Sequence, residues 1–143
     1  MNAPIKVVID SSVIVKWLSE QDENYVVQAN RVLDDVKEGQ ITLYAPELAK
    51  YETANALLTG KYVAPRDVKV SLVTLYSSPI QFSPETLELA QNTYKIAHES
   101  RITYYDASFV SLANSLNATL VTDNIKHQAK VKGVKVIALK DYK

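Results

Sequence analysis

The stretch IKVVIDSS, residues 5–12, decides the fold. Residues 5–9 are β-branched and nearly all apolar, which is typical of a short strand buried on both faces of a parallel sheet. Asp10 closes this strand, and Ser11 and Ser12 offer capping oxygens to a helix over Val13–Leu18. We therefore expect a carboxylate at the carboxyl end of the first strand, the place where open parallel sheets bind ligands.

The same alternation of strand and helix continues along the chain. Further strands are expected at 41–45, 80–82, 118–122 and 134–138, and the helices between them are expected to begin near Asp22, Pro46, Pro65, Ser83 and Thr103, with a short lysine-rich helix before the last strand. Such alternation is typical of a doubly wound α/β protein. We predict a single domain over residues 1–143, a three-layer α/β sandwich with a mostly parallel five-stranded sheet.

Composition limits the classes of site that the chain can form. The 143 residues are 47% hydrophobic and carry 16 Lys+Arg against 16 Asp+Glu, which argues against disorder. Without cysteine, disulfides and thiolate metal sites are excluded, and two histidines exclude a three-histidine zinc site. Any metal must be held mainly by oxygen. The chain also lacks an apolar run of about 18 residues and a signal-peptide start, so we expect a cytoplasmic protein without membrane contact.

A local positive charge lies near the end of the chain. Residues 125–143 contain six lysines and one acid, Asp141, although the whole chain is neutral. Lysines grouped along one edge are typical of a surface that faces phosphates, and they are also typical of an ordinary solvated surface. We take Lys126, Lys130 and Lys132 as candidates for RNA binding.

Four acids are expected at one rim of the sheet. Asp10 and Asp123 follow strands, Glu52 lies in a helix that follows a strand, and Asp106 lies at a helix start. Grouped carboxylates repel one another, so a cation among them favours the cluster at neutral pH. Oxygen donors point to Mg²⁺ or Mn²⁺. A metal site of this kind can activate water for hydrolysis of a phosphodiester.

Each acid also has a structural explanation. Asp10 could cap the first helix, and Glu52 could be an ordinary solvent-facing glutamate. Asp106 stands three residues after Thr103, the spacing of a capping box, and Asp123 could be a loop residue after a strand. The pattern of residues alone leaves both interpretations open for each acid.

Four stretches of sequence, in this order and spacing, resemble those of a known family. They are VVIDSSVIVKW (7–17), APELAKYETANAL (45–57), ITYYDASFVSLA (102–113) and ATLVTDN (118–124). Together they resemble the PIN-domain ribonucleases, in particular the VapC-type toxins of toxin–antitoxin pairs. The resemblance covers essentially the whole chain.

The resemblance implies an activity and a set of site residues. It implies Mg²⁺-dependent cleavage of RNA at an acidic metal site made of Asp10, Glu52 and Asp106, in which Asp10 and Asp106 are metal ligands. Ser12 would bind the first carboxylate, and Asn55 would support the helix face that carries Glu52. The resemblance further implies a five-stranded parallel sheet, frequent homodimers and inhibition by an antitoxin protein.

The fourth acidic position departs from the family pattern. The family commonly has T-x-D or T-x-N after the fourth strand, whereas this chain has Thr122-Asp123-Asn124. The motif favours Asn124 at the site, supported by Thr122, while charge favours Asp123 as a catalytic acid and the stronger ligand for a hard cation. Adjacent residues of an extended chain point to opposite sides, so both are not expected to reach one ion.

Other activities remain as alternatives. The strongest alternative is a PIN-like module that binds RNA or protein without cutting. A haloacid-type phosphatase would need a second acid two residues after Asp10, where the chain has Ser12. A phosphoreceiver would need an acidic pair before its phosphoacceptor. The sequence disfavours both of these enzymes.

Overall fold

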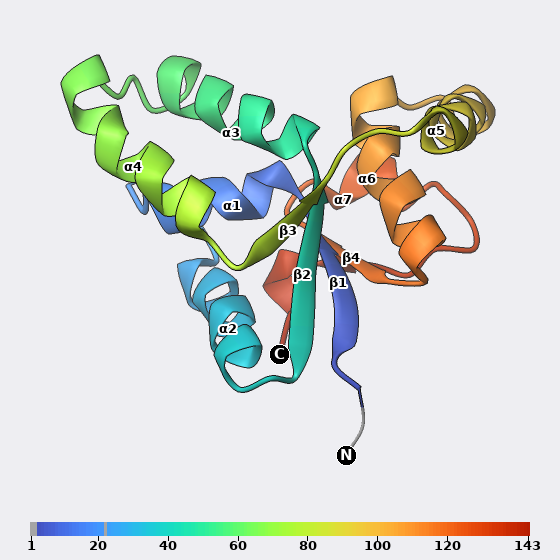
Figure 1. Ribbon diagram of the computed structural model, residues 1–143, viewed down its shortest axis with the longest axis horizontal. Helices are drawn as coiled ribbons and strands as arrows, with labels where there is room; N and C mark the ends of the chain where they lie inside the picture. Colours follow the sequence, from blue (N-terminus) through green and yellow to red (C-terminus); the bar gives the residue numbers. More distant parts are fainter. Residues whose placement is uncertain (1–2, 22) are drawn as a thin grey trace.

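Figure 1 shows the computed structural model, which describes residues 3–21 and 23–143. Strands and helices alternate along the chain. They are, in order, β1 (Ile5–Ile9), α1 (Ser11–Leu18), α2 (Val26–Lys37), β2 (Ile41–Pro46), α3 (Leu48–Thr59), α4 (Pro65–Ser77), β3 (Ile80–Ser83), α5 (Leu87–Ser100), α6 (Tyr104–Leu116), β4 (Thr119–Thr122), α7 (Ile125–Gln128), β5 (Val136–Ala138) and a 3₁₀ turn, η1 (Leu139–Asp141).

The five strands form one sheet in the order β3-β2-β1-β4-β5, and every neighbouring pair is parallel. This confirms the predicted α/β fold with a parallel five-stranded sheet. β1 lies in the centre, and its residues Val8 and Ile9 are fully buried, as expected of a strand covered on both faces. The strand order reverses between β1 and β4, so these two strands flank the topological switch point.

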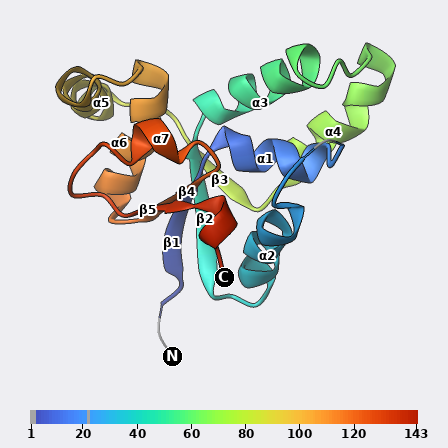
Figure 2. The ribbon, with the colours of Figure 1, turned by 180° about the vertical axis from the view of Figure 1, so that it is seen from behind.

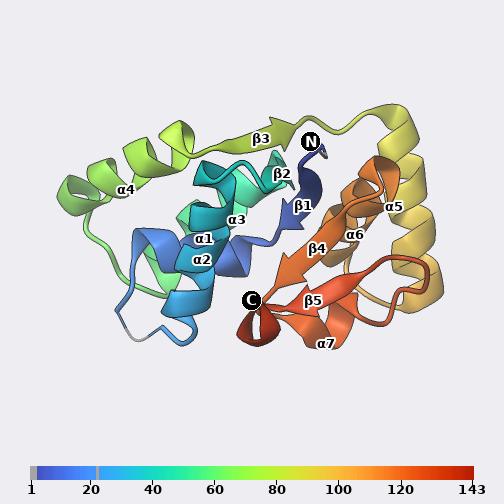
Figure 3. The same cartoon turned by 90° about the horizontal axis from the view of Figure 1, so that it is seen from below.

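Helices cover both faces of the sheet (Figure 3). α1 and α2 lie on one face, where α1 also contacts α3 and α4, and α6 lies on the other face with α5 outside it. Figure 2, the view from behind, shows the C-terminal turn η1 against α2. The hydrophobic core lies between these layers and includes the fully buried Phe109 of α6. Within the described residues, no helix is long and apolar enough to cross a membrane.

The first helix begins earlier than expected and has a different cap. We predicted a helix over Val13–Leu18 capped by Ser11 and Ser12, but α1 begins at Ser11 and its N-cap is Asp10. The Asp10 backbone is extended, and its carboxylate accepts a hydrogen bond from the Ser12 amide at 3.1 Å. The two serine hydroxyls donate to carboxylates instead of capping the backbone.

Three other helix starts were, in contrast, predicted too early. The second helix was expected from Asp22, which lies outside the described residues, but α2 begins at Val26 after Tyr25, whose φ of 62° is left-handed. Pro46 was expected to open a helix, but it ends β2 opposite Ser83 of β3. The helix expected from Ser83, which is α5, begins at Leu87.

Strand lengths and one cap explain the remaining differences. Thr86 is the N-cap of α5, because its hydroxyl accepts a hydrogen bond from the Leu89 amide at 3.1 Å. The strands expected at 118–122 and 134–138 are shorter, Thr119–Thr122 and Val136–Ala138. The short helix expected before the last strand is α7 (Ile125–Gln128), but it contains a single lysine, Lys126.

Candidate active site

The switch point of the sheet brings the ends of several elements together. Asp10 directly follows β1, and its backbone N–H donates to the Val121 carbonyl of β4 at 3.0 Å. Asp106 lies in the first turn of α6, and Glu52 lies in α3. The candidate site is therefore built at the carboxyl ends of parallel strands, as the sequence predicted.

Asp10 is buried and held by three donors. Its Oδ2 accepts hydrogen bonds from the Ser12 amide at 3.1 Å and from the Ser12 hydroxyl at 2.6 Å. Its Oδ1 accepts from Gln128 Nε2 at 3.2 Å. The structural explanation of Asp10 is confirmed, because its Oδ2 caps α1, and the same carboxylate lies close enough to Asp106 to feel its charge.

Glu52 points into the site and is not a free solvent-facing glutamate. Its Oε1 accepts a hydrogen bond from the Ser11 hydroxyl at 2.8 Å, across 41 residues of sequence. Its side chain is half-buried. The contact joins α3 to the start of α1 and orients the carboxylate toward the other acids.

Asp106 has the helix-start position that the sequence predicted. Its backbone N–H donates to the Thr103 hydroxyl at 3.0 Å, which is the Thr103 half of the predicted capping box. An acid in a first turn is favoured by the helix dipole. The cap fixes the start of α6, so the Asp106 side chain leaves the helix beside the switch point.

The three carboxylates are close enough to act on one another. Burial raises the pKa of Asp10, the hydrogen bonds from Ser12 and Gln128 oppose this, and the charge of Asp106 raises it further. Burial also raises the pKa of Glu52, and the charges of Asp10 and Asp106 add to that effect. Asp10, Glu52 and Asp106 therefore form one group of mutually repelling acids, which we call the acidic triad.

Asp123 is not in the same electrostatic position. Its Oδ2 lies 3.1 Å from the ammonium of Lys16, and its backbone N–H donates to the Ser12 hydroxyl at 3.0 Å. Lys16 is buried and also binds Glu23 Oε1 at 2.9 Å. The carboxylate of Asp123 is thus paired with a cation of the chain itself.

The remaining residues predicted to support the site lie on α3 and on the turn after β4. Asn55 is exposed on α3, three residues after Glu52. Thr122 is fully buried, and its hydroxyl accepts a hydrogen bond from the Asn124 amide at 2.9 Å. Asn124 is the exposed N-cap residue of α7, so Thr122 shapes the turn that carries Asp123 and Asn124.

The candidate lysines for RNA binding are not on one surface. Lys126 is exposed on α7, just after the carboxyl end of β4. Lys130 and Lys132 line a polar cavity with Glu99 of α5 and Asn114 of α6. Asn114 is eight residues beyond Asp106 along α6, about 12 Å at 1.5 Å per residue. Lys130 and Lys132 therefore lie toward the opposite rim of the sheet from the acidic triad.

Sequence reasoning missed two residues of the site, Lys16 and Gln128. Gln128 is fully buried, and its Nε2 donates to Asp10 Oδ1 and, at 3.4 Å, to the Asp106 backbone carbonyl. Because both partners are acceptors, the amide nitrogen must face them. A lysine between apolar residues, as Lys16 is between Val15 and Trp17, is the one signal in the sequence that could have indicated a buried charge.

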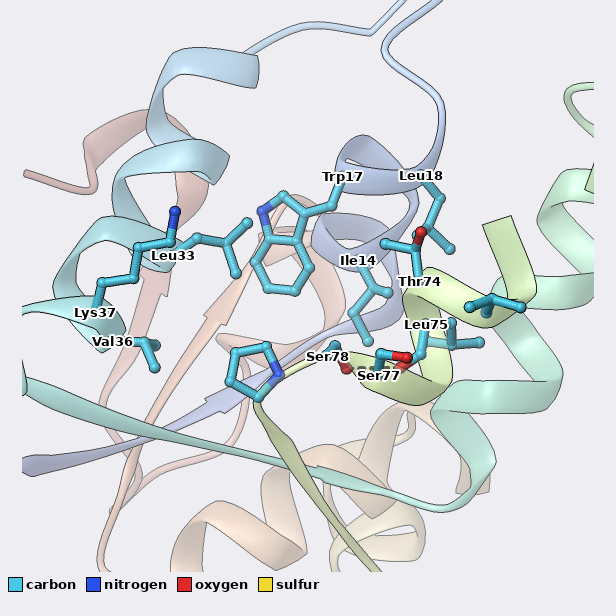
Figure 4. Close-up of a pocket in the computed structure, with 12 residues that line it drawn as sticks. Ile14, Trp17, Leu18, Leu33, Val36, Lys37, Thr74, Leu75, Ser77 and Ser78 are labelled. Atoms are coloured by element: carbon cyan, nitrogen blue, oxygen red, sulfur yellow. Dashed lines mark hydrogen bonds between the residues drawn. The ribbon is translucent and has the colours of Figure 1, made fainter. Parts of the chain in front are cut away.

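A separate apolar groove lies between α1, α2 and α4 (Figure 4). It has a volume of about 550 Å³, and its lining includes Trp17, Leu33 and Leu75. Lys37 is the one charged residue among those that line it. Among the described residues that line the groove, none carries a carboxylate for acid–base or metal chemistry, so the acidic triad is the better candidate for a reactive site.

The residues of the triad carry the type of ligand that a hard cation prefers. All three supply carboxylate oxygens, and the raised pKa of Asp10 and of Glu52 indicates negative charge that lacks full compensation. Within residues 3–21 and 23–143, however, no three acidic or histidine side chains are gathered closely enough to hold an ion as they lie. The Asp10 and Glu52 carboxylates are instead turned toward the donors of Ser12, Gln128 and Ser11.

Asp10→Asn should stabilise the metal-free protein at neutral pH. Asparagine keeps the capping oxygen but removes a buried charge. Because the pKa of Asp10 is raised in the folded state, its ionisation costs stability as the pH rises from 3.8, its ordinary value, through the folded-state pKa. The gain from the substitution should therefore be largest at neutral pH and disappear toward pH 3.8.

Urea unfolding of both proteins in chelator, over this pH range, measures the difference. Asp34→Asn removes an exposed carboxylate from α2 and serves as the matched control, which should leave the free energy of unfolding nearly unchanged. A parent protein that is more stable than Asp10→Asn at neutral pH would contradict the repulsion inferred here.

Comparison with protein families supports the assignment of the fold. A family model described as the PIN domain matches residues 7–134. The comparison with curated proteins finds no significant match.

Solved structures with the same fold come from bacteria and archaea. A chain of VapBC2 from Rickettsia felis, bound to a DNA fragment from its promoter, superposes with a TM-score of 0.70 at 14% identity, over 94% of this chain and 98% of that one. PAE2754 from Pyrobaculum aerophilum gives 0.66 at 24% identity, over 95% and 90%. Mycobacterium tuberculosis VapC20, described as a sarcin-ricin loop cleaving toxin, gives 0.61 at 12% identity, over 79% and 85%.

The match of the family model covers most of the chain, and it includes the residues that carry the acidic triad. The neighbouring structures show the same fold over 79–95% of this chain. The chain belongs to the PIN domain family.

Proposed function

We propose that this protein is a metal-dependent endoribonuclease and the toxin of a type II toxin–antitoxin pair. The observation that carries the proposal is the acidic triad, because three carboxylates that repel one another at the switch point of the sheet are a costly arrangement without a cation. Membership of the PIN family and the fold shared with VapBC proteins support the same activity.

The triad would hold Mg²⁺ or Mn²⁺, with Asp10 and Asp106 as direct ligands and Glu52 as the third acid. When bound, the cation supplies a Lewis acid that polarises the phosphate and lowers the pKa of attacking water. Ser11 would orient Glu52 through the hydrogen bond from its hydroxyl to Oε1. Ser12 and Gln128 would keep the buried Asp10 carboxylate in place.

The substrate of this chemistry is a phosphodiester of RNA. Hydrolysis forms a bond from water oxygen to phosphorus, breaks the bond to the leaving oxygen, and leaves a proton from the water on that oxygen. Exposed Lys126, at the same end of the sheet as the triad, would bind a phosphate of the substrate strand.

The partner in this proposal is an antitoxin protein. Several of the structures that share the fold are toxin–antitoxin complexes, among them one from Klebsiella pneumoniae and FitAB bound to DNA. The apolar groove between α1, α2 and α4 is open to such a partner, and its lining is almost uncharged. A homodimer also forms part of the proposal.

Asp106→Asn should reduce RNA cleavage by at least about 100-fold, the scale of losing a charged group that acts on the reacting phosphate. Asp106 is suited to this test because its backbone N–H, which the substitution keeps, makes the capping hydrogen bond to Thr103 at the start of α6. Purified protein is incubated with mixed RNA, with Mg²⁺ or with chelator. Asp34→Asn on α2 is the control and should cleave at the parental rate.

The same assay distinguishes the alternative function. Cleavage that persists in chelator, or an Asp106→Asn variant that cleaves like its parent, would contradict the proposed metal site. A parent protein that binds RNA in a mobility-shift assay but never cuts it would instead support the PIN-like binding module.

Lys126→Gln should weaken RNA binding more than Lys132→Gln. Lys126 lies at the end of the sheet that carries the triad, whereas Lys132 lies toward the opposite rim. The logarithm of the affinity falls as the logarithm of the salt concentration rises. Each lost phosphate contact on single-stranded RNA makes this slope shallower by about 0.7. Binding of a single-stranded RNA oligonucleotide is measured in the Asp106→Asn background, so that the RNA stays intact.

The two lysine variants carry the same change of charge, so each controls for the other. Equal losses of affinity and slope would mean that the substrate also reaches Lys132. An unchanged slope in Lys126→Gln would remove Lys126 from the RNA-binding surface.

A further inference from the structure

Lys16 is a buried cation that the proposed chemistry does not yet use. Its side chain is 3% exposed, although it lies on α1 only six residues after Asp10. Burial alone would lower the pKa of Lys16, but its hydrogen bonds to Glu23 and Asp123 outweigh burial and raise it. The ammonium is therefore kept charged inside the protein by two carboxylates.

The contacts of Lys16 continue to the acidic triad through Asp123. Lys16 Nζ lies 3.1 Å from Asp123 Oδ2, and the Asp123 backbone N–H donates to the Ser12 hydroxyl at 3.0 Å. That hydroxyl donates to Asp10 Oδ2 at 2.6 Å. A continuous series of polar contacts thus runs from Lys16 through Asp123 and Ser12 to Asp10.

The direction of these hydrogen bonds makes the series specific. A serine hydroxyl has one proton and is otherwise free to rotate. Because the Ser12 oxygen accepts from the Asp123 N–H, its lone pair is engaged on that side and its proton is left for Asp10. Moving the turn that carries Asp123 would remove the N–H that holds the Ser12 oxygen, so the hydroxyl would rotate more freely and its hydrogen bond to Asp10 would weaken.

The two carboxylates that bind Lys16 depend on it to different degrees. Glu23 also binds the ammonium of Lys61, so it keeps a cation if Lys16 is lost. Asp123 has Lys16 as its cation among the ion pairs of the described residues. Losing Lys16 would therefore leave Asp123 as a further uncompensated negative charge beside the triad.

We propose that Lys16 is a positioning residue, which fixes the Asp123 turn and thereby, through Ser12, the orientation of the Asp10 carboxylate. The role in catalysis rests on the proposed ribonuclease function, whereas the contact itself does not. In this arrangement Asp123 holds the turn in place and is not a metal ligand, which leaves the acidic triad as the metal site.

The test compares Lys16→Met with Lys61→Met. Both substitutions remove one ammonium from Glu23 and keep a long apolar side chain, but only Lys16→Met removes the cation from Asp123. The first readout is amide hydrogen exchange by NMR at Asp123 and Ser12, the two N–H groups of the series, relative to the exchange of core amides in each variant. The second readout is kcat and KM for RNA in saturating Mg²⁺.

In Lys16→Met, hydrogen exchange at the Asp123 and Ser12 amides should become at least about tenfold faster relative to the core amides. The kcat should fall about tenfold with little change in KM, as expected for the loss of a residue that orients a metal ligand. Lys61→Met should change neither the exchange of these two amides nor kcat. Lys16→Arg, which keeps the positive charge, should retain part of the amide protection and part of the kcat that Lys16→Met loses. If Lys16→Met does not fold, Asp123→Asn tests the same contact and should lower kcat in the same direction.

Unchanged protection of the Asp123 amide in Lys16→Met would overturn the proposal, and so would equal losses of kcat in the two lysine variants. A raised KM with an unchanged kcat would also overturn it, since it would place Lys16 in substrate binding. If the parent protein does not cleave RNA, the proposed function fails, and the exchange measurement still decides whether Lys16 holds the turn.

Discussion

The repulsion among Asp10, Glu52 and Asp106 is the constraint on which the rest of this structure depends. Three carboxylates meet at the carboxyl ends of parallel strands, and burial makes the charges of Asp10 and Glu52 more costly. Hydrogen bonds from nearby side chains partly offset this cost. Ser11 donates to Glu52, and Ser12 and Gln128 donate to Asp10. A protein without use for a cation would gain stability by losing one of these acids.

The fold contributes to the site through helix starts as well as donors. Asp10 is the N-cap of α1 and Asp106 lies in the first turn of α6, so two of the three acids benefit from the positive end of a helix dipole. Parallel strand order places these two starts at the same end of the sheet. Two acids of the triad are thereby fixed by regular elements, which hold side chains more firmly than loops do.

Local patterns predicted the sheet and four acids at one rim, and the family resemblance singled out three of these acids. Long-range contacts explain what both missed. The apolar strands and the acids that follow them were visible in the sequence because strand burial and helix capping act over a few residues. Pro46 was placed in a helix because its pairing with β3 depends on a partner 37 residues away. Likewise, the contacts of Lys16 with Asp123 and of Gln128 with Asp10 span more than a hundred residues.

The position of a bound cation tests the central claim most directly. Crystals of the parent protein soaked in Mn²⁺ would reveal the ion by its anomalous scattering. We predict a peak within about 2.2 Å of carboxylate oxygens of Asp10 and Asp106, on the side of Asp10 that faces Glu52, with Asp123 still bound to Lys16. No peak among the three acids, or a peak held by Asp123 without Asp106, would contradict the acidic triad as the metal site.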